Sequence, residues 1–120
     1  MPEAVIHGSL EEIRRFAQNV GYSENSAGTR KLVDAIKGFQ IVVCGHQLTV
    51  AGGDFKYVGR DSSDVDTDRS GVFDADVDKN VGEIVHKLAA GEDLYVTQTG
   101  SSAINGTVYY YFQDTKDPQV

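Results

Sequence analysis

The sequence predicts one α+β domain, in which about three helices pack on an antiparallel sheet of five to six strands. Apolar residues recur at helical spacing in three segments that each end at a glycine. Short runs rich in β-branched and aromatic residues lie between these segments and are separated by turn residues. The length of 120 residues is typical of one domain, so we expect a single unit over residues 1–120.

The predicted helices each combine an apolar stripe with a terminating glycine. Ser9 and Glu12 have the spacing of a capping box, and they follow a short expected strand at residues 4–6. The later stripes, such as Leu32, Val33 and Ile36, have the same helical spacing. The expected helices cover residues 9–20, about 26–37 and about 79–90.

The remaining apolar runs predict strands that form two hairpin regions. Gly45–His46 and Gly52–Gly53 are expected turns of a three-stranded meander, and Asn105–Gly106 is the strongest hairpin signal in the chain. The expected strands cover residues 39–44, 47–51, 54–58, 94–99 and 107–113. Each hairpin region follows a predicted helix, so the chain is expected to contain two helix-plus-hairpin units, with a frayed tail at residues 114–120.

Acidic residues are concentrated in one stretch of the chain. The formal net charge is −7, and residues 60–78 contain seven aspartates with few large apolar residues, which predicts an acidic surface loop. Negative charge repels phosphate backbones and anionic membranes, so we expect neither non-specific nucleic-acid binding nor membrane binding. A basic protein partner fits this charge.

The cysteine content and the apolar runs favour a cytoplasmic protein. Cys44 is the single cysteine, so no intrachain disulfide can form. The first residues lack the basic start and the apolar run of a signal peptide. The longest apolar run, Ile41–Cys44, is too short to span a membrane.

Alternating aspartates are a candidate metal site. Three carboxylates on one side of an extended segment resemble the opening of an EF-hand calcium loop. The candidate ligands are Asp64, Asp66, Asp68, Asp74, Asp76 and Asp78. The resemblance stops at Arg69, which stands where that loop needs glycine, and at Ala75, which stands where it needs glutamate. Calcium binding is therefore an alternative to a solvated loop.

Two further alternatives depend on other residues. Cys44 and His46 could form part of a small enzyme site with an acid such as Asp54, although the chain lacks the further ligands of a zinc site. A helix pair followed by a hairpin, with Arg30 and Lys31 on the second helix, imitates a winged-helix nucleic-acid binder. The acidic net charge argues against that reading.

The last predicted strand offers the best candidate contact surface. It carries four consecutive rings, Tyr109, Tyr110, Tyr111 and Phe112, and alternation sends two of them to each face of the sheet. We expect these rings, together with Asp64, Asp66 and Asp68, to bind a partner. The sequence therefore predicts a non-enzymatic protein-binding module without a cofactor, such as an inhibitor (including a virus-encoded one), an adaptor or an assembly subunit, with homo-oligomers as a further option.

Overall fold

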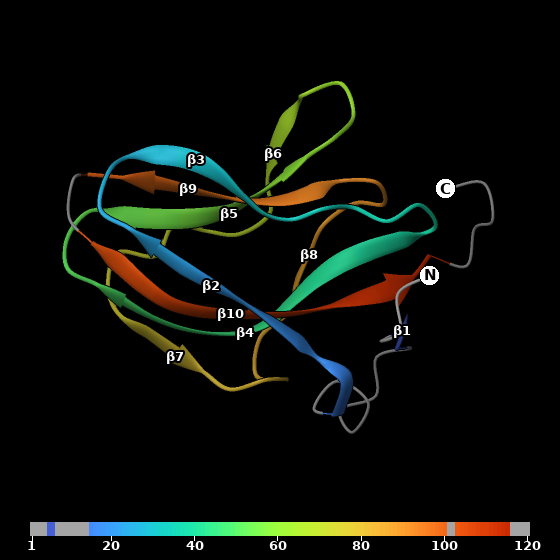
Figure 1. The fold of residues 1–120 in the computed structure, drawn as a ribbon, viewed down its shortest axis with the longest axis horizontal. Coiled ribbons are helices and arrows are strands. Elements are labelled where there is room, and N and C mark those ends of the chain that lie inside the picture. The colour runs from blue at the N-terminus through green and yellow to red at the C-terminus, as the bar shows by residue number, and fades with distance from the viewer. Residues whose placement is uncertain (1–4, 7–14, 101–102, 116–120) are drawn as a thin grey trace.

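Long-range strand pairing organises the chain into a β-sandwich, seen from its edge in Figure 1. The structure is a computed structural model that describes residues 5–6, 15–100 and 103–115. Sheet A contains β1 (Val5–Ile6), β2 (Gln18–Glu24), β4 (Phe39–Val50), β7 (Val77–Lys79), β8 (His86–Lys87) and β10 (Ile104–Asp114). Sheet B contains β3 (Gly28–Val33), β5 (Asp54–Arg60), β6 (Asp66–Asp68) and β9 (Asp93–Thr99).

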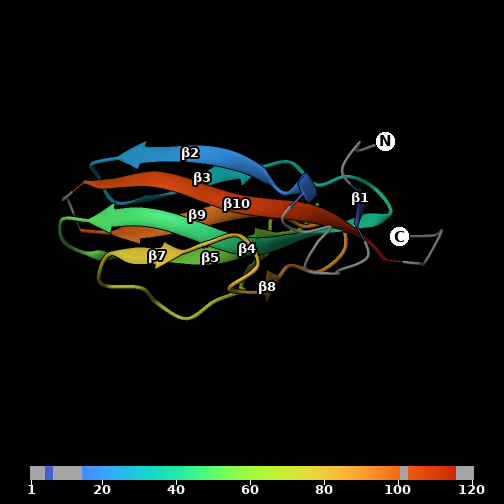
Figure 2. The ribbon, with the colours of Figure 1, turned by 90° about the horizontal axis from the view of Figure 1, so that it is seen from below.

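The long antiparallel pair β4–β10 is the backbone of sheet A. Its register runs from Ile104 opposite Val50 to Asp114 opposite Phe39, with a shift between Tyr109 and Tyr110. On the other side of β10, β2 pairs antiparallel and β1 pairs parallel, whereas β7 and β8 pair with the free side of β4. Figure 2 shows β2, β10, β4 and β7 side by side in this order.

Sheet B is smaller and has one projecting hairpin. The strand order is β3-β9-β5-β6, and all its pairs are antiparallel. The short strand β6 continues from β5 through a tight loop, and this hairpin extends away from the body of the sandwich in Figure 1.

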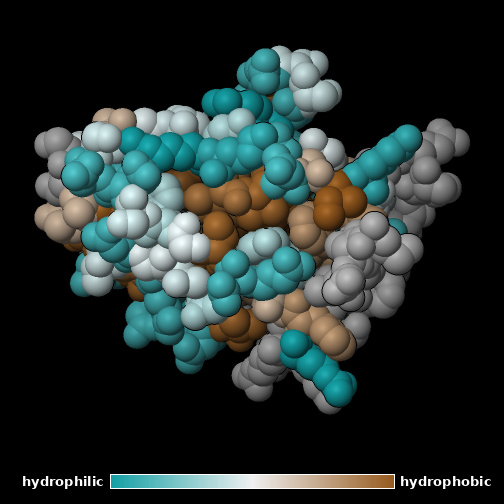
Figure 3. All heavy atoms as spheres, in the orientation of Figure 1, coloured by the Kyte–Doolittle hydropathy of each residue, from teal (hydrophilic) through white to brown (hydrophobic). Residues whose placement is uncertain are grey.

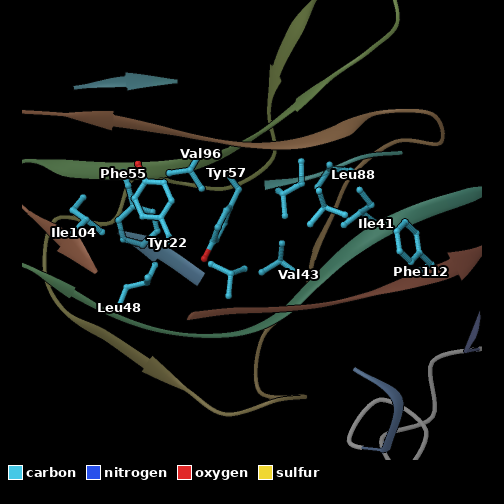
Figure 4. Close-up of a cluster of buried hydrophobic side chains, with 13 residues drawn as sticks. Tyr22, Ile41, Val43, Leu48, Phe55, Tyr57, Leu88, Val96, Ile104 and Phe112 are labelled. Carbon is cyan, nitrogen blue, oxygen red and sulfur yellow. The ribbon is translucent and has the colours of Figure 1, made fainter. Parts of the chain in front are cut away.

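Side chains that alternate inward from both sheets form the main core. Phe55, Tyr57 and Val96 come from sheet B, and they face residues such as Val43 and Ile104 of sheet A (Figure 4). A second, smaller cluster lies on the other face of sheet A, which we call its outer face. It consists of Val42, Cys44 and Tyr111, with Ala17, Val81 and Tyr109 packed against them.

The predicted α+β fold class is wrong, because the described parts of the three expected helices consist of strands, turns and irregular backbone, apart from Arg15 and Phe16. Residues 9–14 of the first expected helix lie outside the described residues, and its end belongs to β2. The second expected helix contains β3, and the third contains the end of β7, turns and β8. Pairing with distant strands outweighs local helical spacing here.

Two expected turns are also wrong. Gly45–His46 lies inside the continuous strand β4, and Asn105–Gly106 lies inside β10, so neither pair makes a hairpin. The expected strands at residues 54–58 and 94–99 do coincide with β5 and β9. The described helical residues include no stretch long and apolar enough to cross a membrane.

Candidate binding surface

Residues 61–78, here called the acidic segment, begin at the tip of the β5–β6 hairpin. The Asp61 carboxylate accepts hydrogen bonds from the backbone N–H groups of Ser63 and Val65, at 2.8 Å and 3.0 Å, and closes the loop. Asp64 at the tip has a positive φ of 61°. Figure 3 shows the projecting hairpin covered mainly by hydrophilic side chains.

The strand of this hairpin is held by exposed ion pairs. Arg60 makes two bonds to the Asp66 carboxylate, at 2.6 Å and 3.2 Å, and Lys56 lies 3.0 Å from Asp68. The Arg60 guanidinium lowers the pKa of Asp66. Both carboxylates remain exposed to solvent.

The second half of the acidic segment returns to sheet A. Asp76 accepts a hydrogen bond from the Val50 N–H at 2.6 Å, and Asp78 accepts one from the Gln47 side chain at 3.1 Å. Asp74, Asp76 and Asp78 are all exposed. In the described parts of the chain, no three His, Cys, Asp or Glu side chains converge as a metal site. Calcium binding therefore stays a prediction.

Gln47 connects the acidic segment with the ring-rich strand. Its side-chain nitrogen donates to Asp78, and its oxygen accepts from the Tyr109 hydroxyl at 3.2 Å. A hollow of about 460 Å³ lies beside it; its lining includes Asp76, Asp78 and Asn105. The structure thus brings one predicted tyrosine and two predicted aspartates to the same side of sheet A.

The other predicted rings lie mostly in the interior. Tyr111 and Phe112 are 3% and 5% exposed and belong to the outer and main clusters, respectively. Tyr110 is half-buried against the main core, and burial raises the pKa of both Tyr110 and Tyr111. Tyr109 therefore offers the most accessible position for a contact through the outer face.

Cys44 and His46 lie on opposite faces of sheet A. Cys44 is buried in the outer cluster, where burial raises the pKa of its thiol to about 11. His46 is buried in the main core, and Asp54 is bonded to Thr99 at 2.7 Å. The structure thus brings none of the three proposed enzyme residues together.

The surroundings of His46 were not evident from the sequence. Its ring is 1% exposed, and Nδ1 lies 2.6 Å from the Tyr57 hydroxyl. Burial lowers the pKa of His46 to about 4, with smaller contributions from His86 and Lys79. The His46 ring belongs to a group of five rings in mutual contact, which we call the ring cluster. Its members are His46, Phe55, Tyr57, Phe73 and His86.

The helix pair that the winged-helix alternative requires is not formed in the described residues, where strand β3 lies in the expected second helix. Arg30 lies on strand β3, 3.1 Å from the Glu24 carboxylate, and also bonds Ser26 at 2.9 Å. Lys31 lies 2.9 Å from Asp34 and 3.6 Å from Asp93. Both cations are thus engaged with acidic neighbours.

Comparisons with known proteins bear on the fold alone. No family model and no curated protein sequence matches this chain. The subunit of Bacillus endospore appendages, described as a novel family of disulfide-linked pili, has a TM-score of 0.50 and 12% identity over 80% of this chain and 81% of its own.

Two other solved structures show weaker likeness. The nucleoplasmin-like N-terminal domain of Drosophila FKBP39 has a TM-score of 0.41 and 12% identity over 79% of this chain and 89% of its own. The capsular polysaccharide assembling protein CapF from Staphylococcus aureus has a TM-score of 0.40 and 11% identity over 86% of this chain and 27% of its own. The appendage subunit therefore supports the β-sandwich architecture and nothing further.

Proposed function

We propose that this protein is a non-enzymatic binding module that recognises a basic protein through its acidic segment. Inhibitors, adaptors and assembly subunits all belong to this class. The observation that carries the proposal is the concentration of charge. The segment holds seven aspartates and one arginine, so nearly all of the chain's net charge of −7 resides in it.

The arrangement of these charges suits an interface that attracts its partner at long range. Six of the seven aspartates are exposed, and they extend from the projecting hairpin to the edge of sheet A. Arg69, the one cation of the segment, is held by Glu92 at 2.7 Å. A surface of one sign accelerates encounter with a surface of the opposite sign and makes binding sensitive to salt.

The hollow beside Gln47 extends this surface onto sheet A. Asp76 and Asp78 line it, and none of the described residues that line it is basic. The hydroxyl of the half-buried Tyr109 bonds Gln47, which lines the hollow. Tyrosine is favoured at protein interfaces because it combines a large ring with a polar tip. The proposal therefore places the partner over the acidic segment and the adjoining part of the outer face.

The proposal is tested with a partner that is captured from lysate at low salt, identified and purified. We expect association to slow and affinity to fall about tenfold between 50 mM and 300 mM salt. The double variant Asp64→Asn, Asp74→Asn should lower the association rate and flatten this salt dependence. Asparagine tolerates the positive φ at position 64, so the fold should persist.

A matched double variant removes the same charge elsewhere. Glu24→Gln and Asp34→Asn lie near β3, outside the acidic segment. We expect this variant to bind at nearly the wild-type rate. The proposal would be contradicted if both double variants lost the same factor in association rate, or if the affinity did not depend on the salt concentration.

A further inference from the structure

We propose that acid loosens residues 73–87, which include Asp74, Asp76 and Asp78, from the body of the sandwich, because two histidines belong to the ring cluster that holds this stretch. The effect on a bound partner rests on the proposed function. The loosening itself does not, and it can be measured on the protein alone.

Phe73 is the first anchor of this stretch. Its N–H donates to the Phe55 carbonyl at 2.8 Å, and its carbonyl accepts from the Phe55 N–H at 2.9 Å. Its ring stacks on Phe55 with centroids 5.0 Å apart and meets His46 edge-on at 5.1 Å. The stretch is therefore attached to sheet B through a contact that includes the His46 ring.

Two short strands attach the same stretch to sheet A. Strand β7 pairs with β4 over three positions, one of which sets Lys79 opposite His46. Strand β8 pairs with β4 over two positions, and its His86 ring lies 5.8 Å from Tyr57 and 5.9 Å from Phe73. Three attachments of the stretch, at Phe73, Lys79 and His86, therefore lie on or next to the ring cluster. The others are the bond of Asp76 to the Val50 N–H, the bond of Asp78 to Gln47, and the packing of Val81 on the outer cluster.

Protonation of this cluster places positive charges that no carboxylate of the described residues pairs with. The titratable or charged side chains that face His46 in the described residues are Tyr57 on β5, Lys79 on β7 and His86 on β8. Burial lowers the pKa of both histidines, that of His46 to about 4. An imidazolium at position 46 would lose its hydration and repel Lys79, and protonation of His86 would add to the repulsion.

Linkage gives the direction and the pH window. The folded pKa of His46 lies below the ordinary value of 6.5, so the closed state binds fewer protons than an open state in which the ring meets water. The closed state is therefore fully favoured above pH 6.5 and loses that advantage as the pH falls toward 4. Between pH 7 and pH 4.5 the ratio of open to closed molecules should rise roughly 50-fold from His46.

The opening is expected to be local. The β2–β10 and β3–β9 pairs contribute no member to the ring cluster, and each extends over a longer ladder than β7 or β8 has with β4. Arg69 and Glu92 are joined by two bonds of 2.9 Å and 2.7 Å, and this pair holds the chain on both sides of the stretch that opens. Elements with few contacts open first.

Hydrogen exchange of the full chain tests the inference. Backbone amide exchange is followed by NMR between pH 7 and pH 4.5 and corrected for intrinsic rates. The reporters are the amides of Phe73, Gly82 and Leu88, which bond Phe55, Cys44 and Ile41. We expect the protection of Phe73 and Gly82 to fall roughly 50-fold. The β3–β9 amides should keep their protection, and Leu88 should mark the boundary.

Three variants identify the group responsible. His46→Gln, which is neutral at every pH, should flatten the dependence of protection on pH. If this variant fails to fold, His86→Gln replaces it, because His86 is less buried, and should reduce the slope of that dependence. Glu92→Gln tests whether a carboxylate causes the effect: it should lower protection by a similar factor at every pH and leave the slope of the profile unchanged. The inference is overturned if protection is independent of pH, if both sheets lose protection together, or if only Glu92→Gln alters the slope of the profile.

The proposed function and this inference can fail separately. If residues 73–87 open in acid but the purified basic partner binds independently of the acidic segment, the proposed function is wrong and the inference holds. If the partner binds through the aspartates but the stretch stays protected at pH 4.5, the inference is wrong and the proposed function holds.

Discussion

Gly106 illustrates how one backbone position permits the close approach of two central strands. It has a φ of +150°, and a Cβ atom there would lie 1.9 Å from the Gln47 carbonyl oxygen and 2.9 Å from the Leu48 Cα. Both neighbours are backbone atoms of β4, so they cannot rotate away. The Asn-Gly pair thus serves strand packing at this position, although its sequence is typical of a turn.

Gly106→Ala should therefore lower the free energy of unfolding by about 1–3 kcal/mol. The control is Gly71→Ala, where a Cβ would meet nothing within 4 Å. Urea denaturation measures both variants. Equal midpoints for the two variants would contradict the account of the β4–β10 contact.

Tyr57 satisfies a buried nitrogen of His46. Tyr57→Phe removes the hydroxyl that lies 2.6 Å from Nδ1 and leaves this nitrogen without its partner in the core. The expected loss in the free energy of unfolding at pH 7.5 is about 1–3 kcal/mol.

Tyr110→Phe is the matched control, because its hydroxyl bonds the half-buried Gln18 at 3.2 Å and water can replace that bond. We expect it to cost less than about 1 kcal/mol. If the control were as damaging as Tyr57→Phe, the buried nitrogen would not be the cause.

Among the elements, residues 79–90 show why helical spacing misled the prediction. Val81, Ile84, Val85 and Leu88 suit one face of a helix, yet Val85 is 58% exposed while Leu88 is 1% exposed. Gly82 has a φ of +91°, and its N–H donates to the Cys44 carbonyl at 2.8 Å. A backbone bond to a strand 38 positions away outweighs local spacing.

The connection between β6 and β9 depends on a buried carboxylate. Glu92 is 5% exposed, makes two bonds to Arg69 and accepts the Ala89 N–H at 2.8 Å. Glu92→Gln should cost about 1–3 kcal/mol of unfolding free energy, because Arg69 and a backbone donor lose a charged acceptor. Urea denaturation at pH 7.5 measures the loss.

Asp66→Asn, in the β5–β6 hairpin, is the control for Glu92→Gln. It breaks the solvent-exposed pair with Arg60 and should cost less than about 1 kcal/mol. A larger loss for Asp66→Asn than for Glu92→Gln would show that the exposed pair, rather than the buried one, secures this part of the chain.

For the whole molecule, the uneven charge predicts a response to salt. The net charge is −7 and most of it lies in the acidic segment, so self-repulsion should weaken the folded state at low ionic strength. The midpoint of thermal unfolding should rise by several degrees between 20 mM and 500 mM NaCl as this repulsion is screened.

The Asp64→Asn, Asp74→Asn variant serves as the comparison, since it removes two charges from exposed positions. Its midpoint should depend less on salt than that of the wild-type chain. An identical salt dependence would mean that repulsion within the acidic segment contributes little to stability.

Local composition was sufficient to predict some of the strands of this molecule. Runs such as residues 54–58 and 94–99 combine aromatic and β-branched residues, and they are strands because such residues fit a half-buried pleated surface. Six of the seven aspartates of the acidic segment are exposed, since aspartates at this density cannot be buried without partners. The expected loop nevertheless contains strand β6 and the start of β7.

The order of the strands and the position of His46 depend on pairing between residues that are distant in the sequence. Which strand lies beside which depends on backbone partners such as Ile104 and Val50, and the sequence does not name these partners. The same pairing places strands within the described parts of the three expected helices, and it places His46 in the core beside Tyr57 instead of in the expected turn. A strand gains its hydrogen bonds from another segment, whereas a helix gains them from its own neighbours, so local patterns are an incomplete guide to a β-sandwich.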